Sequence, residues 1–397
     1  MDAQEGLGSA KLRLPAAPSD TDVPMRPSAW LAHLQLLANL PYPLEVLMPS
    51  VLYTLRQGLR ADYGSFTPLE PRTLRSGAIY AERFAPEMMG WLCAARETAQ
   101  AAHSTEMMVR SDGESRRALC LASDFEDNPL YRHLLQPLGT RWSMTAPLLD
   151  AKGDTRGLLY LHRSAAHGPF SDAEQALLRR ARNVLQPLAL PRQSDAPEDG
   201  DIPRVGLRQA SVVIDGRGRF IGVGDGAREL LYRCAKPGPG ETAWLTPGVE
   251  ALPAPVMDDV LNLLWAARRG TALPQTAPRR LRGQAGEHEF RLEPLGTCTG
   301  RPGTMVVVHV RHLEPTDITL ARRLTHWKLS PQERRMLITA LRHPDQHALA
   351  ERLGISLHTL KSYSTDMVRR HGFASRQKMT EAVLRRPLAS CEGAPAC

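Results

Sequence analysis

Residues 329–386 read LSPQERRMLITALRHPDQHALAERLGISLHTLKSYSTDMVRRHGFASRQKMTEAVLRR, and they contain the most specific structural signals of the chain. Ser330, followed by Pro331 and then Glu333, is typical of a capped helix start. A glycine such as Gly354 commonly ends a helix, because glycine readily adopts the left-handed backbone conformation that this position requires. Ser356 can cap the helix that follows. A helix, a tight turn and a second capped helix predict a helix-turn-helix.

The helix that begins after Ser356 has an apolar and a polar side. Leu360, Met367 and either Tyr363 or Ser364 lie on one side, and side chains with hydrogen-bond donors recur at helical spacing on the other. These side chains suit a DNA groove, because Lys, Ser and Thr bond base edges or phosphates and Arg engages the backbone. The polar side consists of His358, Lys361, Ser362, Thr365 and Arg369.

The whole stretch resembles the LuxR-type four-helix DNA-binding domain. The matching motifs are Leu329-Ser330-x-x-Glu333, Leu349-Ala350-x-x-Leu353-x-Ile355-Ser356-x-x-Thr359-Leu360-Lys361 and Gly372-Phe373-x-Ser375-Arg376. In that family the residues matching Lys361, Ser362 and Thr365 face bases, and those matching Thr359 and Tyr363 lie near the backbone. We therefore expect base reading by Lys361, Ser362, Thr365 and His358. We expect backbone contacts by Ser356, Thr359, Tyr363, Arg369 and Arg376.

The resemblance also implies that the fourth helix pairs two protomers. Its apolar stripe is Met379, Ala382 and Val383, which a head of about 60 residues would not fully cover. We expect a homodimer whose two heads bind adjacent half-sites of a promoter operator in double-stranded DNA.

The charge distribution agrees with a nucleic-acid contact. The 397 residues carry 50 Lys and Arg against 42 Asp and Glu, a net charge of +8. Residues 318–390 hold 14 basic and 5 acidic residues, which leaves 36 and 37 for the rest of the chain. The entire excess of positive charge therefore falls in one block of domain size. An exposed Arg-rich helix pair without a nucleic-acid partner would give the same charges.

Composition divides the chain before this block. PRQSDAPEDGDIP has three prolines and four acids, which predicts a linker at residues 191–203. We assign an N-terminal tail to residues 1–37, sensory domains to 38–190 and 204–313, the DNA-binding domain to 314–390 and a second tail to 391–397.

The first sensory domain resembles the end of a GAF domain. The stretch MTAPLLDAKGDTRGLLYLHRSAAHGPFSDAEQALL, residues 144–178, reads as a strand, a hairpin, a strand and a capped helix. Ser171 and Glu174 form the capping box of that helix. We also expect a helix at 44–59 and strands at 63–69 and 118–122.

The second sensory domain resembles a PAS domain. VVIDGRGRFIGVGDGARELL, residues 212–231, predicts a hairpin with a turn at 215–218 and a short helix. A longer helix follows at 256–267 and two strands at 287–292 and 304–310. An unrelated α+β domain would show the same order.

The sequence offers little chemistry for catalysis or metal binding. The six cysteines form no CxxC pair, and Pro344 separates His343 from His347. Asp258 and Asp259 are adjacent on a helix, so they cannot face one substrate together. We predict no enzyme activity, no metal and no cofactor. We also predict no membrane span, because prolines and polar residues interrupt the longest charge-free stretch.

The predicted fold class is therefore multidomain, with two α+β sensory domains followed by an all-α helix-turn-helix domain. The expected function is sequence-specific DNA binding by a cytoplasmic transcription regulator whose sensory domains respond to a signal. A small-molecule effector is one candidate for that signal. One alternative is a quorum-sensing regulator with an acyl-homoserine lactone in the N-terminal domain. Trp30, Tyr42, Tyr53 and Trp91 do not align with the aromatic pattern of such pockets. An alternative of another class is a sensor enzyme fronted by GAF and PAS units, which would need a catalytic domain.

Overall fold

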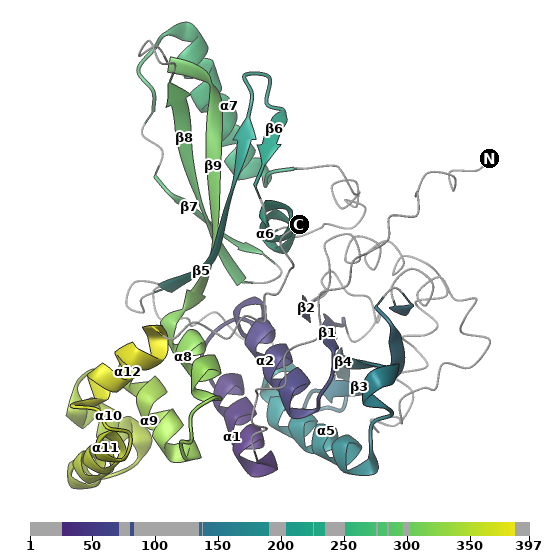
Figure 1. Cartoon of the computed structure of the whole chain (residues 1–397), viewed down its shortest axis with the longest axis vertical. Helices are drawn as coiled ribbons and strands as arrows, with labels where there is room; N and C mark the ends of the chain where they lie inside the picture. Colours follow the sequence, from purple (N-terminus) through teal and green to yellow (C-terminus); the bar gives the residue numbers. More distant parts are fainter. Residues whose placement is uncertain are drawn as a thin grey trace.

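The computed structural model describes residues 26–70, 80–82, 135–136, 138–189, 204–224, 226–234, 251–274, 277–283, 286–296 and 302–385. It is a mixed α/β structure with two antiparallel sheets and a group of C-terminal helices (Figure 1). The strand expected at 118–122, the linker at 191–203, Trp91 and the tail at 391–397 lie outside the described residues. None of the helices in the described ranges combines the length and apolar character that a bilayer span requires.

The first unit is a four-stranded sheet with helices on one face. Its strands follow the order β2-β1-β4-β3. The unit contains α2 (Leu44–Gly58), β1 (Tyr63–Pro68), β2 (Tyr80–Glu82), β3 (Thr140–Leu149), β4 (Thr155–Ser164) and α5 (Asp172–Leu185). Phe66, Met144 and Leu161 of the sheet share a buried cluster with these helices. The capping box of Ser171 and Glu174 is present, as predicted.

Helix α1 (Pro27–Ala38) corrects the predicted N-terminal tail at 1–37, because residues 27–37 are helical. Trp30 is buried, and its Nε1 donates a 2.7 Å hydrogen bond to the carbonyl of Thr54 in α2. A Cβ at Gly58 would lie 1.9 Å from that same nitrogen, so only glycine allows the two helices to approach so closely. The prolines and polar residues that concealed this helix in the sequence are compatible with it, because Pro27 takes the first helical position.

The second unit is a five-stranded antiparallel sheet in the order β6-β5-β9-β8-β7. The unit contains β5 (Arg204–Ile214), β6 (Phe220–Val223), α6 (Ala227–Cys234), α7 (Ala254–Arg269), β7 (Arg279–Gly283), β8 (Gly286–Gly296) and β9 (Pro302–Pro315). Its core joins one sheet face to α6 and α7. The predicted turn at 215–218 is present, and Gly218 in it has φ +77°. Backbone hydrogen bonds to the carboxylate of Asp215, that from Arg219 first, lower the pKa of Asp215 to about 2. Strand β7 was not predicted, because its sequence RRLRG has a single large apolar residue.

The C-terminal group has five helices among the described residues, one more than predicted. They are α8 (Thr316–Leu324), α9 (Pro331–Arg342), α10 (Gln346–Leu353), α11 (Leu357–Arg370) and α12 (Arg376–Arg385). The capping box of Ser330 and Glu333, the left-handed Gly354 and the cap at Ser356 are present, as predicted. Helix α8 was not predicted, and it follows β9 without a loop.

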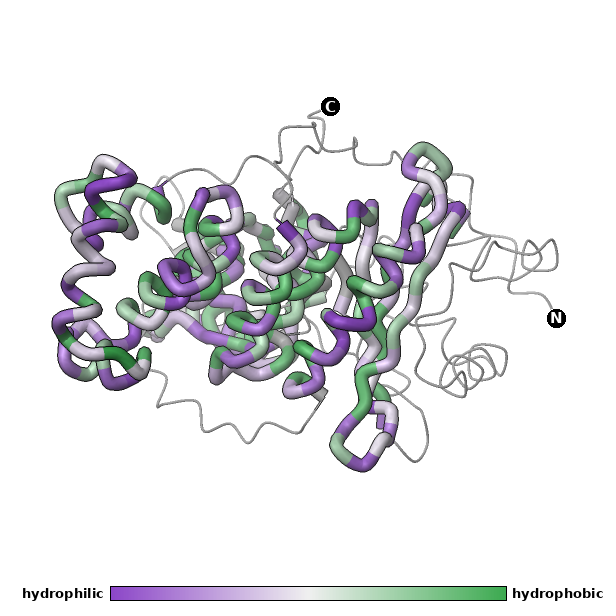
Figure 2. Tube along the Cα trace, turned by 90° about the horizontal axis from the view of Figure 1, so that it is seen from below, coloured by the Kyte–Doolittle hydropathy of each residue, from purple (hydrophilic) through white to green (hydrophobic). Residues whose placement is uncertain are grey.

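One apolar core runs from the first unit into the C-terminal helices. Leu34 of α1 and Val51 of α2 belong to the same buried cluster as Ile318 of α8 and Leu337 of α9. Figure 2 shows hydrophobic and hydrophilic residues alternating along these helices, as expected for helices that bury one side. The C-terminal helices are therefore packed against the first unit, in addition to their covalent connection to β9.

Candidate nucleic-acid interface

Helix α11 exposes the side that the sequence singled out. His358, Lys361, Ser362 and Thr365 are exposed, whereas Leu360 and Met367 on the other side are almost completely buried. The cap fixes where the helix begins, because the Oγ of Ser356 accepts a 3.0 Å hydrogen bond from the amide of Thr359. The four predicted base-reading side chains thus lie on one accessible face of a helix anchored by its apolar side.

The predicted backbone contacts have more varied surroundings. Thr359 is half-buried, and its hydroxyl is 2.8 Å from that of Ser356. Tyr363 is 45% exposed. Arg369 forms a 3.0 Å ion pair with Asp366 one turn earlier, which DNA phosphates would have to replace. Burial lowers the pKa of the half-buried Arg376 guanidinium, which lies at the start of α12 rather than on α11.

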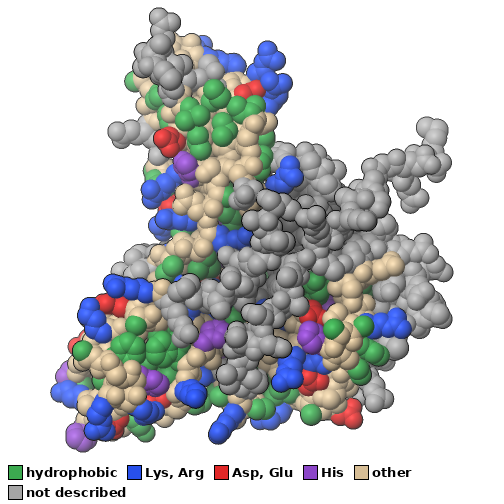
Figure 3. All heavy atoms as spheres, in the orientation of Figure 1, with side chains coloured by type: hydrophobic (Ala, Val, Ile, Leu, Met, Phe, Trp, Pro, Cys, Tyr) green, Lys and Arg blue, Asp and Glu red, His purple; other side chains and the backbone are tan. Residues whose placement is uncertain are grey.

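Contacts with neighbouring helices hold α11 in place. Arg370, at its C-terminal end, forms a 3.0 Å ion pair with Glu333, whose carboxylate also closes the capping box of α9. The Oδ2 of Asp345 accepts a 2.8 Å hydrogen bond from the amide of Ala348, which starts α10 before the turn at Gly354. In Figure 3, Lys and Arg side chains surround these helices on the visible face, with few acidic side chains among them. A polyanion would meet a surface of mainly positive charge there.

The predicted dimer stripe on α12 is covered within the same chain. Met379 and Val383 have no exposed surface, and only Ala382 is half-buried. Helix α12 packs against α8, and Arg323 of α8 donates hydrogen bonds to the carbonyls of Val383 and Leu384. The expectation that the stripe would lack cover within one chain is wrong for Met379 and Val383, because α8 supplies the missing surface. Dimerisation itself stays a prediction.

A buried polar cluster joins the C-terminal helices to the first unit. Asp317 of α8 is fully buried. Its Oδ1 accepts a 2.8 Å hydrogen bond from the hydroxyl of Tyr42, and its Oδ2 accepts a 2.7 Å bond from the Nε of Arg342 in α9. The guanidinium of Arg342 lies 4.7 Å from the centre of the Tyr42 ring. Burial, and then the negative charge of Asp317, raises the pKa of Tyr42.

Two further polar contacts extend this interface. The carboxylate of Glu314, at the end of β9, accepts hydrogen bonds from Thr319 at 2.6 Å and from Ser50 of α2 at 3.5 Å, and it pairs with Arg322. The hydroxyl of Tyr53 in α2 lies 3.4 Å from Nε2 of His326. Both contacts link α2 to the segment around α8.

His33 of α1 is a buried base in the same interface. Burial, assisted by the charge of Arg334 in α9, lowers its pKa to about 3. Neither ring nitrogen has a hydrogen-bond partner among the described residues. Its protonation would place a second positive charge beside Arg334 in an apolar interface, which disfavours the packed arrangement.

The sheet face of the first unit that points away from α5 carries polar and aromatic residues. Register places Tyr63, His162 and Ser143 in one row across β1, β4 and β3. Ser143 Oγ lies 2.8 Å from Nδ1 of His162, and burial lowers the pKa of His162 to about 4. Tyr160 is on the same face, with its ring centre 6.3 Å from that of His162. Tyr63 and His162 are buried, and Tyr160 is half-buried.

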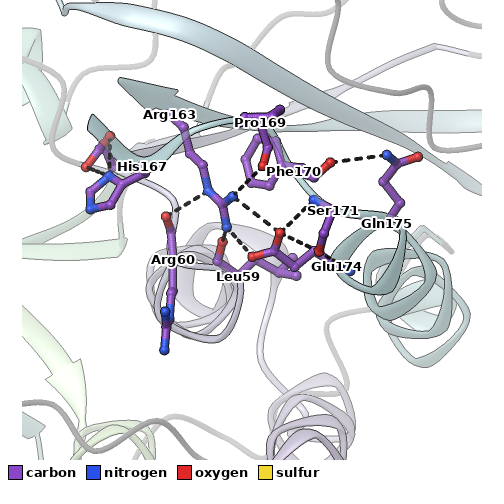
Figure 4. Close-up of polar contacts among 10 residues, drawn as sticks. Leu59, Arg60, Arg163, His167, Pro169, Phe170, Ser171, Glu174 and Gln175 are labelled. Carbon is purple, nitrogen blue, oxygen red and sulfur yellow. Dashed lines mark hydrogen bonds and ion pairs between the residues drawn. The ribbon is translucent and has the colours of Figure 1, made fainter. Parts of the chain in front are cut away.

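A buried arginine joins the elements on the other face of this sheet (Figure 4). Arg163 of β4 donates to the carbonyls of Leu59 and Arg60 at 2.5 and 3.0 Å, and it pairs with Glu174 in the capping box of α5. Its guanidinium lies 4.0 Å from the centre of the Phe170 ring. The Arg163 side chain is only 4% exposed, and its contacts in Figure 4 join β4 to the end of α2 and the start of α5, so we interpret it as a structural residue.

No group of three or more His, Cys, Asp or Glu side chains in the described ranges is arranged to hold a metal ion. Trp30, Tyr42 and Tyr53, the described aromatic residues that we compared with lactone pockets, instead connect α1, α2 and the C-terminal helices.

A GAF domain is found at residues 43–184. No curated protein matches the chain. The phycoerythrobilin-bound GAF domain from a cyanobacterial phytochrome is 16% identical, covering 45% of this chain and 100% of its own, with a TM-score of 0.30. PelD 158-CT from Pseudomonas aeruginosa PAO1 is 15% identical over 80% of this chain and 84% of its own, with a TM-score of 0.26. The sensor region of a sensor histidine kinase is 13% identical over 72% and 93%, with a TM-score of 0.19.

Proposed function

We propose that this chain is a sequence-specific DNA-binding transcription regulator whose GAF domain senses a signal. The observation that carries the proposal is α11, which exposes His358, Lys361, Ser362 and Thr365 while Leu360 and Met367 anchor it. This arrangement suits a recognition helix in a DNA major groove. The helix caps support a LuxR-type domain, and the predicted hairpin at 215–218 supports a PAS domain at 204–313. In this proposal the protein regulates in the cytoplasm as a homodimer and is not an enzyme.

The proposal includes a route from the signal to the DNA-binding helices. A small-molecule effector would bind the GAF sheet beside Tyr63, Tyr160 and His162, on the opposite face from α1, α2 and α5. Any resulting shift of α2 would act on Asp317 and Glu314 through Tyr42 and Ser50. Two packed arrangements of these helices would present α11 to DNA differently, and the effector would change their relative populations.

The test uses the full-length protein, because the C-terminal helices share their core with α1 and α2. Genomic fragments retained by the protein would be sequenced, and affinity for an enriched site would be compared with that for random duplex. We expect the affinity for DNA to fall steeply as the salt concentration rises. Each neutralised phosphate should add about −0.9 to the slope of the logarithm of the binding constant against the logarithm of the salt concentration. Absence of any enriched site, or binding that salt does not change, would contradict the proposal.

A further inference from the structure

Helix α7 has an uncovered apolar centre on its outer face. Leu261 is 46% exposed and Trp265, one turn later, is 57% exposed. The opposite side of the helix is buried in the core of the second unit through Val256, Val260 and Leu263. Large apolar side chains exposed next to each other are typical of an interaction surface, and Trp is the residue most enriched at energetic centres of interfaces.

Neighbouring groups hold this surface in shape. The guanidinium of Arg269 stacks 3.8 Å from the centre of the Trp265 ring. The turn between β5 and β6 borders Leu261, because a Cβ on Gly218 would lie 3.4 Å from its Cδ2. Arg268 donates a hydrogen bond to the carbonyl of Gly216 in that turn. A surface fixed in this way loses little side-chain entropy when it binds.

Charge on the same face changes sign along the helix. Asp258, one turn before Leu261, is exposed, and so are Arg268 and Arg269, one turn after Trp265. The face therefore carries an exposed carboxylate at its start, apolar side chains in the middle and two guanidinium groups at its end. Arg279, which pairs with Asp259, also lies near Asp258. A uniformly acidic or basic partner would match only one of these ends.

We propose that this face binds the same face of a second copy of the chain, with the two α7 helices antiparallel across a two-fold axis near residue 263. With a rise of about 1.5 Å per residue, Asp258 and Arg268 are about 7.5 Å from the axis on opposite sides. Asp258 of each copy then meets Arg268 and Arg269 of the other, and Leu261 meets the second copy's Trp265. Such reciprocal contact is what a two-fold interface requires. This inference does not depend on DNA binding.

The first test is Trp265→Glu in the full-length protein, measured by sedimentation velocity without DNA over a range of concentrations. We expect wild type to dimerise and the variant to raise the dissociation constant at least about tenfold. Ile221→Glu is the matched control, because Ile221 is 54% exposed on β6 of the same unit. The control should dimerise like wild type. Wild type that stays monomeric up to roughly 100 µM would overturn the inference, and so would dissociation by Ile221→Glu alone.

The second test does not depend on the Trp265 variant remaining folded. Asp258→Arg and the double variant Arg268→Glu with Arg269→Glu should each be mainly monomeric, because like charges meet twice in either homodimer. Mixing the two proteins restores opposite charges at both contacts, so dimers should reappear. A mixture that remains monomeric, while wild type dimerises, would show that the dimer forms elsewhere and would overturn the inference.

Discussion

The hydroxyl of Tyr42 donates a 2.8 Å hydrogen bond to Asp317, although the two residues are 275 positions apart in the sequence. Tyr42 precedes α2 of the GAF domain and Asp317 lies in α8, so this bond joins the proposed sensor to the proposed DNA-binding helices. Arg342 completes the cluster by neutralising the carboxylate of Asp317. The GAF domain and the C-terminal helices are thus held together by a buried charge as well as by apolar packing.

Removing Arg342 should destabilise the protein strongly. Arg342→Leu leaves the fully buried Asp317 without its cation, which typically costs about 3–5 kcal/mol. Tyr42→Phe removes one hydrogen bond to a charged group and should cost about 1–3 kcal/mol. Urea denaturation would measure both. Equal stability of Arg342→Leu and wild type would mean that the cluster contributes nothing to the joined arrangement.

Lys361 should determine which DNA sequence is bound. Lys361→Ala should reduce the preference for operator over random duplex by about 1–3 kcal/mol, if the side chain bonds a base. Thr359→Ala should weaken binding to operator and to random duplex to a similar extent. Lys378→Ala is the charge-matched control, because Lys378 lies on α12 and pairs with Glu381. If Lys361→Ala weakened binding to operator and to random duplex equally, Lys361 would contact the phosphate backbone and not a base.

His33 should make stability depend on pH. Burial, aided by Arg334, lowers its pKa to about 3, while the unfolded chain takes up the proton near 6.5. The folded state therefore loses stability as pH falls below 6.5, by up to about 1.4 kcal/mol per pH unit until the folded pKa is reached. The free energy of unfolding, measured from pH 7 to 5, should decrease less in His33→Leu than in wild type. Parallel pH profiles would contradict this role.

Arg163 should be essential to the GAF domain's stability. Arg163→Leu removes the cation that pairs with Glu174 and the side-chain donor to the carbonyls at the end of α2, and we expect a loss of about 3–5 kcal/mol. Arg163→Lys keeps the charge but cannot reproduce the forked contacts, so we expect an intermediate loss. Thermal unfolding followed by circular dichroism would rank the variants. If Arg163→Lys were as stable as wild type, the positive charge alone would account for the contribution of Arg163 to stability.

The sequence predicted elements whose signals are local. The capping boxes at Ser171 and Ser330, the cap at Ser356 and the left-handed Gly354 all act within a few residues, and each is present in the structure. The same local signals predicted which side of α11 would be buried, because helical periodicity separates Leu360 and Met367 from Lys361. Helices α1 and α8 went unpredicted. Their N-cap residues, Arg26 and Pro315, make no side-chain capping bond, and both helices are shorter than α2 and α7, which apolar periodicity predicted without such a bond.

Local sequence signals therefore specify the capped or periodic helices and the hairpins, and the sequence also shows the concentration of positive charge in residues 318–390. Which apolar side chains stay exposed depends on tertiary packing. Met379 and Val383 were expected at a dimer interface, but α8 covers them, while Trp265 of α7 is left exposed. Burial depends on contacts between distant segments, such as Tyr42 with Asp317, and such contacts leave no periodic signal along the chain.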